Sequence, residues 1–105
     1  MNQYELLTEV LLELRVAARA IDSEASLKST MRKYDMLFMG ENFNYITSIE
    51  LAHTIRTIFD LPITNEELLK ITPAVCSALG MNYEAMSRIE NAGTGSIDAF
   101  TITLF

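Results

Sequence analysis

Two short stretches, one near the middle of the chain and one in its second half, fix where helices begin. Residues 47–50 read Thr-Ser-Ile-Glu and residues 64–67 read Thr-Asn-Glu-Glu, and each has the form of a capping box. In such a box the threonine side chain accepts a hydrogen bond from the start of the helix, and the glutamate reaches back to the threonine amide. The sequence therefore predicts two consecutive helices with firmly defined starts.

The ends of these two helices are marked by proline and glycine. Pro62 ends the first helix, because its ring disfavours helical geometry in the residue before it. Gly80 is a natural left-handed stop for the second. Pro73 lies between them and lacks an amide donor, so we expect a break or kink there. The sequence leaves open whether residues 64–80 form one kinked helix or two.

Apolar residues at spacings of three and four predict two more helices earlier in the chain. The first covers residues 3–21, with three glutamates on the side away from the apolar stripe. The second covers residues 24–39 and is stopped by Gly40. Residues 43–46 alternate and are rich in strand-forming side chains, which predicts a short strand before the capped helices.

Residues 81–105 change to the alternation that is typical of strands. A first arm at 86–90, a glycine-bearing turn at 91–95 and a second arm at 97–105 predict a β-hairpin, with Phe100, Ile102 and Leu104 on one face. A chain of 105 residues, half of them apolar, is long enough for one hydrophobic core. We therefore predict a single domain over residues 1–105 that is mainly α with a C-terminal β-hairpin.

This order of elements resembles the winged helix-turn-helix family over about residues 24–105. The residues that carry the resemblance are Tyr45-Ile46-Thr47 before one helix, Thr64 opening the next, Ala78-Leu79-Gly80 closing it, and residues 88–103 as the wing. The resemblance implies a winged-helix-like body of four to five helices, counting the N-terminal one. It implies that helix 64–80 enters the DNA major groove, or that the domain serves as a protein-interaction module.

The distribution of charge favours protein contacts. The formal charge is −6, and only residues 15–33 carry a net positive charge. A negatively charged protein is repelled by nucleic acid at long range. The predicted reading helix opens with Asn65, Glu66 and Glu67, and Lys70 is its one cation. We therefore expect a small regulatory or adaptor protein that acts on another protein, with a regulator that binds double-stranded DNA as the alternative.

The candidate contact residues are the basic side chains. Five of them lie on the first two predicted helices and can form a patch for an acidic partner or for phosphates. Helix 64–80 and the wing add one each. The full set is Arg15, Arg19, Lys28, Arg32, Lys33, Lys70 and Arg88. An ordinary solvated polar face is the alternative interpretation of the same residues.

A heptad spacing in the first helix indicates a second kind of contact. Apolar residues recur one heptad apart, with others at the complementary positions, which is the pattern of a helical seam. The seam consists of Leu7, Val10, Leu14, Ala17 and Ile21. It predicts either a homodimer through this helix or packing of the helix onto its own domain.

Nothing in the sequence indicates an enzyme, a cofactor or a metal site. His53 and Cys76 are single residues of their types, and no group is marked to orient them as a base and a nucleophile. A structural zinc site needs four cysteine or histidine ligands. Charged residues interrupt the apolar stretch at 6–21, and the N-terminus has no basic start of a secretory signal. We therefore expect a cytoplasmic protein without membrane contact.

Overall fold

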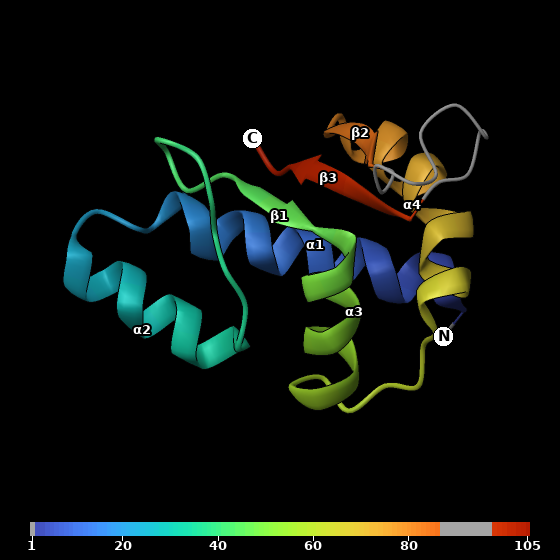
Figure 1. The fold of residues 1–105 in the computed structure, drawn as a ribbon, viewed down its shortest axis with the longest axis horizontal. Helices are drawn as coiled ribbons and strands as arrows, with labels where there is room; N and C mark the ends of the chain where they lie inside the picture. The colour runs from blue at the N-terminus through green and yellow to red at the C-terminus, as the bar shows by residue number, and fades with distance from the viewer. Residues whose placement is uncertain (1, 87–97) are drawn as a thin grey trace.

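The computed structural model describes residues 2–86 and 98–105. Within these ranges the elements are α1 (Gln3–Arg19), α2 (Glu24–Tyr34), β1 (Tyr45–Thr47), α3 (Ser48–Thr57), α4 (Asn65–Leu79), β2 (Asn82–Met86) and β3 (Ala99–Thr103). The strands form one antiparallel sheet in the order β1-β3-β2. The predicted class is confirmed at this level, since the described chain is mainly helical with a small antiparallel sheet (Figure 1).

The helices differ in how they meet the sheet. α1 runs behind the sheet and packs against α4, while α3 packs against β1, β3 and α4 (Figure 1). α2 lies at one end of the molecule, away from β2 (Figure 1). The core between these layers is built from aliphatic side chains such as Leu11 of α1, Leu51 of α3 and Ile102 of β3, all fully buried. Among the described residues no helix is long and apolar enough to cross a membrane.

The two predicted helix starts are confirmed, one of them in part. The Thr64 hydroxyl accepts from the Glu67 amide at 3.1 Å, and the Glu67 carboxylate accepts from the Thr64 amide at 3.3 Å. The Thr47 hydroxyl likewise accepts from the Glu50 amide at 3.2 Å. The predicted return bond of Glu50 is wrong, because the loop after α2 brings the amide of Leu37 within 3.1 Å of its carboxylate.

α4 is one helix and not two. It continues through Pro73 and ends at Gly80, which has the predicted left-handed geometry at φ 70°. Of the predicted break or kink at Pro73, the break is therefore wrong, and residues 65–79 form the single helix that the sequence left open as one of two alternatives. Buried residues lie on both sides of the proline, among them Leu68 and Cys76. They hold the helix in place, because packing of an apolar face supplies most of the stability of a helix in a protein.

α2 ends at Tyr34, five residues before the predicted end. Asp35 adopts a left-handed conformation at φ 49° and ψ 48°, and the amide of Met36 donates to the carbonyl of Met31 at 3.3 Å. Gly40, the predicted stop, instead opens a turn at φ 90°. The predicted range of 24–39 is therefore too long.

The early end of α2 has a physical reason in the burial pattern. Tyr34, Met36 and Phe38 are buried, whereas Leu37 and Met39 are exposed. This alternation is that of an extended chain, and Met39 forms an antiparallel bridge with the first residue of β1. The spacing of four from Tyr34 to Phe38 fits both a helix and a strand, so the sequence pattern alone was ambiguous.

The C-terminal hairpin is confirmed in part. β3 lies within the predicted second arm and pairs with β2 along its length. The predicted first arm is placed too late, because β2 begins at Asn82, four residues before the predicted start, and residues 87–90 lie outside the described residues. Phe100, Ile102 and Leu104 are buried, as predicted. The predicted turn at 91–95 and Arg88 lie outside the described residues.

The heptad seam of α1 packs into the core of the same chain. Leu7, Val10 and Leu14 are buried, and Ala17 and Ile21 are partly buried against the core. This is the intramolecular alternative of the sequence analysis. A homodimer through α1 stays a prediction, and it would have to use another face of the helix because these side chains are already covered.

Candidate protein-binding groove

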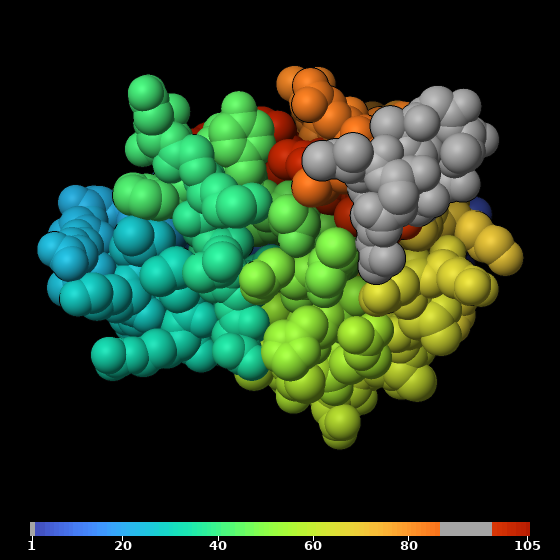
Figure 2. All heavy atoms as spheres, in the orientation of Figure 1, coloured from blue at the N-terminus to red at the C-terminus, as the bar shows by residue number. Residues whose placement is uncertain are grey.

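An open groove of about 780 Å³ lies between α2 and α3. In Figure 2 the teal surface of α2 and its following loop lies beside the green surface of α3. α2 contributes Lys28, Met31 and Arg32 to the lining of the groove. The following loop adds Asp35, Met36 and Leu37. The α3 wall and the start of α4 supply Ile49, Glu50, His53, Arg56 and Asn65. No strand of the described residues lines the groove, so side chains and not a strand edge face it.

Apolar side chains form the floor and part of the rim. Met36 is buried, and Met31 is half-buried beside it. Leu37 and Ile49 are 52% and 55% exposed, although both are large and apolar. Neighbouring exposed apolar side chains with a polar rim mark interaction sites. Methionine adds an unbranched side chain that adapts to different partners.

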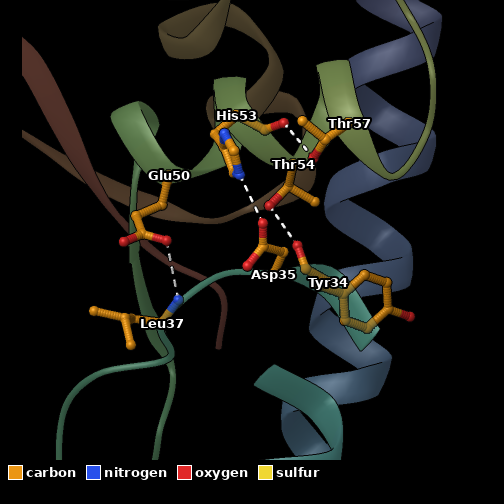
Figure 3. Close-up of polar contacts among 7 residues, drawn as sticks. All are labelled: Tyr34, Asp35, Leu37, Glu50, His53, Thr54 and Thr57. Atoms are coloured by element: carbon orange, nitrogen blue, oxygen red, sulfur yellow. Dashed lines mark hydrogen bonds and ion pairs between the residues drawn. The ribbon is translucent and has the colours of Figure 1, made fainter. Parts of the chain in front are cut away.

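Two hydrogen bonds tie the end of α2 and the loop after it to α3 (Figure 3). The hydroxyl of Thr54 donates to the backbone carbonyl of Tyr34 at 2.7 Å, and this contact is buried. One turn earlier on α3, the carboxylate of Glu50 accepts from the amide of Leu37 at 3.1 Å. These contacts fix the distance between the groove walls, because they join side chains of α3 to the backbone of the last residue of α2 and of the loop that follows it.

A third contact spans the groove between the same two elements. Nε2 of His53 lies 2.7 Å from Oδ2 of Asp35 (Figure 3). Both side chains are about half exposed or more, so the pair adds little stability. Its main effect is that the carboxylate of Asp35 already has a partner inside the groove.

The arginines of the groove lack a carboxylate partner among the residues that the structure describes. Arg32 makes no ion pair or hydrogen bond within the described residues. Within the same described ranges, Arg56 donates only to neutral oxygens, the carbonyl of Ile63 at 3.0 Å and the amide oxygen of Asn65 at 3.4 Å. Their positive charge is therefore not neutralised within the described chain, although the whole protein carries −6.

Of the seven predicted contact residues, the structure brings Lys28 and Arg32 together in this groove. Lys28 pairs with Glu24 one turn earlier at 3.2 Å, and both side chains are exposed. Such a pair contributes little, so Lys28 can exchange its partner at small cost.

The other basic residues of α1 and α2 point elsewhere. Arg15 donates to the carbonyl of Leu79 at 3.3 Å, at the end of α4. Arg19 lies over the ring of Phe105, and Lys33 lies over the ring of Tyr34. The predicted basic patch across helices one and two is therefore divided, and of its residues Lys28 and Arg32 line the groove.

The exposed face of α4 offers little to nucleic acid. Its exposed residues are Asn65, Glu66, Lys70, Ala74, Ser77 and Ala78. At the edge of this face, hydrogen bonds from Gln3 and Thr64 hold the pKa of Glu67 below its ordinary value, so its carboxylate stays charged. The cation Lys70 thus shares its helix with two carboxylates.

His53 and Cys76 do not meet. The ring of His53 pairs with Asp35, whereas Cys76 is buried in α4. Burial raises the pKa of the Cys76 thiol to about 11, so the thiol is protonated at neutral pH. Among the described residues no group of three or more His, Cys, Asp and Glu side chains is placed to hold a metal ion.

Sequence reasoning missed Arg56 and Ile49 as site residues. The available signal was the spacing of Ile49, His53 and Arg56, which puts them on one side of the capped helix. An isoleucine on that polar side was the unusual feature.

Comparison of the chain with protein-family models, curated proteins and solved structures found no match.

Proposed function

We propose that this protein is a small non-enzymatic regulatory or adaptor protein that binds another protein through the α2–α3 groove. The observation that carries the proposal is the coincidence of two properties at one place. The exposed apolar side chains Leu37 and Ile49 share a groove with the unneutralised cations Arg32 and Arg56. A protein surface offers a partner both apolar burial and charge pairing at such a site.

Photo-crosslinking in the source cells tests this proposal. A benzophenone amino acid replaces Ile49 in the groove and, in a matched control, Ala78 on the exposed face of α4. We expect covalent adducts with one or a few proteins from position 49, and fewer from position 78. Arg32→Glu in the position 49 protein should weaken the adducts. Protein adducts at position 78 alone, or none at either position, would overturn the proposal.

A winged-helix-like body from α2 to β3 is part of the proposal. It is supported by the succession of β1, α3, α4, β2 and β3 and by the strand order β1-β3-β2. In such a body the helices before the hairpin can serve either nucleic acid or a protein partner.

The same topology favours a second candidate function, a DNA-binding regulator of winged helix-turn-helix type. α4 would then be the reading helix, with Lys70 and Arg88 among the contacts. The charge of α4 speaks against this function, because Glu66 and Glu67 would face phosphates. Protein binding therefore remains the leading proposal.

A further inference from the structure

We infer that the occupant of the α2–α3 groove is an amphipathic helical segment of a partner protein, with acidic residues beside its apolar face. The inference rests on the proposed function and adds the chemistry of the partner. Three properties of the groove lead to it: the state of its charges, the position of its apolar side chains, and the nature of its walls.

The charges of the groove are arranged so that an incoming carboxylate finds free cations. The two acidic side chains are engaged within the groove, Asp35 with His53 and Glu50 with the amide of Leu37. Arg32 and Arg56 come from opposite walls and have no carboxylate partner in the described part of the chain. Arginine binds carboxylates through two parallel hydrogen bonds. Acidic residues on both sides of a bound segment would therefore be recognised.

The apolar side chains call for a segment with an apolar face. Leu37 and Ile49 are exposed at the rim, above the buried Met36. An amphipathic helix buries anchors at spacings of three, four and seven in grooves of this kind. A small molecule is favoured by an enclosed cavity that covers most of its surface, whereas this groove is open. Duplex DNA would leave Leu37 and Ile49 against its backbone and bring phosphates near Glu50.

The walls favour a helix over an extended peptide. An extended peptide gains affinity by adding to an exposed strand edge, whereas two helices, the loop after α2 and the start of α4 line this groove, with no strand of the described residues among them. The loop amide that faces the opposite wall, that of Leu37, already donates to Glu50. Side chains must therefore supply the recognition, as they do when a helix lies in a groove between two others.

Selection from an unbiased library of displayed peptides tests the inference. Random peptides of about 16 residues, long enough for about four helical turns, are selected on the full-length protein. We expect enrichment of sequences with apolar residues at helical spacing flanked by Asp and Glu. A selected peptide should bind with a Kd on the order of micromolar in fluorescence anisotropy and should become helical in circular dichroism when bound.

Two charge reversals on neighbouring residues provide the matched control. Arg32→Glu and Lys33→Glu change the net charge equally and lie on the same helix, but only Arg32 lines the groove. We expect Arg32→Glu to weaken binding of the selected peptide at least about tenfold, whereas Lys33→Glu changes it less than about twofold. Thermal unfolding of both variants checks that each is folded.

Several results would overturn the inference. The selection could enrich neutral or basic peptides, or enrich no peptide at all. A selected peptide could bind in an extended conformation, or both charge reversals could weaken its binding equally. Preferential binding of a labelled duplex that is lost in Arg32→Glu would show a nucleic-acid site instead. If any of these results appears while position 49 still crosslinks to proteins, the chemistry of the partner is wrong and the proposed function stands.

Discussion

α2 and α4 are both capped helices, yet they differ in what they bury. Both begin with a capping box and end at a left-handed residue, Asp35 after α2 and Gly80 after α4. α4 buries five residues in the core, whereas α2 buries only Tyr34. The caps therefore decide where a helix begins and ends, and burial decides its role. α4 is committed to the core, and α2 is free to form one wall of a groove.

α2 is attached to the rest of the molecule by few contacts. Tyr34 stacks on Phe59 and meets the edge of Phe38, and its carbonyl accepts the buried bond from Thr54. Leu27 and Met31 add partly buried contacts. The groove wall thus depends on one fully buried residue and a few partly buried ones, whereas α4 is held by five buried residues between Leu68 and Cys76.

The largest expected effect is on α4. Leu68→Ala should lower the free energy of unfolding by about 2–5 kcal/mol, because it leaves a cavity in the core. Leu27→Ala, the matched change on α2, should cost clearly less since Leu27 is only partly buried. Urea denaturation followed by circular dichroism measures both. Equal losses would contradict the contrast between the two helices.

A smaller effect is expected where α2 is attached. Thr54→Val removes the donor to the Tyr34 carbonyl and should cost about 1–3 kcal/mol, because a buried acceptor loses its partner. Thr57→Val is the control, since its hydroxyl bonds within α3 at an exposed position. Hydrogen exchange should show faster opening of residues 31–37 in Thr54→Val alone. Unchanged exchange there would mean that this bond does not hold the groove wall.

The buried thiol of α4 predicts a dependence of stability on pH. The ordinary pKa of 9.0 is raised to about 11 by burial. Between these values the unfolded chain loses the Cys76 proton and the folded chain keeps it, so stability is complete below pH 9 and falls as pH rises towards 11. Burial and Glu13 also raise the pKa of Tyr34, which adds a loss of the same sign.

Chemical denaturation at a series of pH values measures this dependence. Cys76→Ala should lower stability at neutral pH and flatten the decline above pH 9. A decline of the same slope in Cys76→Ala would assign it to Tyr34 and other groups instead.

The smallest effect on stability is expected in the groove itself. Asp35→Asn should change the free energy of unfolding by less than about 1 kcal/mol, because the pair with His53 is exposed and asparagine tolerates the left-handed conformation. It removes a negative charge from the groove and should therefore tighten binding of an acidic peptide severalfold, opposite to Arg32→Glu. Weaker binding in Asp35→Asn would mean that the carboxylate itself contacts the partner.

The sequence predicted the parts of the fold that depend on local chemistry. Thr47 and Thr64 cap helices because their partners lie three residues away, and Gly80 ends α4 because a left-handed residue is needed there. The end of α2 was mispredicted because the spacing from Tyr34 to Phe38 fits two periods. Pro73 was overrated as a helix breaker because tertiary packing cannot be read from a local pattern.

The candidate site was predicted only in part, because a groove is a property of two elements. Lys28 and Arg32 were identified as basic residues of one helix, but nothing local places Arg56 opposite them. Glu50 was assigned to its own helix cap and instead binds the loop after α2. The sequence could not reveal which basic residues remain unpaired, since this depends on contacts such as that of Arg15 with the end of α4.

We assign partner binding to the groove beside α2 and no DNA binding to α4. This assignment is tested most directly by fluorescence anisotropy of a labelled mixed-sequence DNA duplex titrated with the protein at low and moderate salt. α4 is the surface that would read DNA, and the α2–α3 groove is the surface proposed for protein. We predict no binding even at low salt, where electrostatic attraction is strongest. Micromolar binding that weakens steeply with salt, and that is lost in Lys70→Glu but kept in Arg32→Glu, would contradict this assignment.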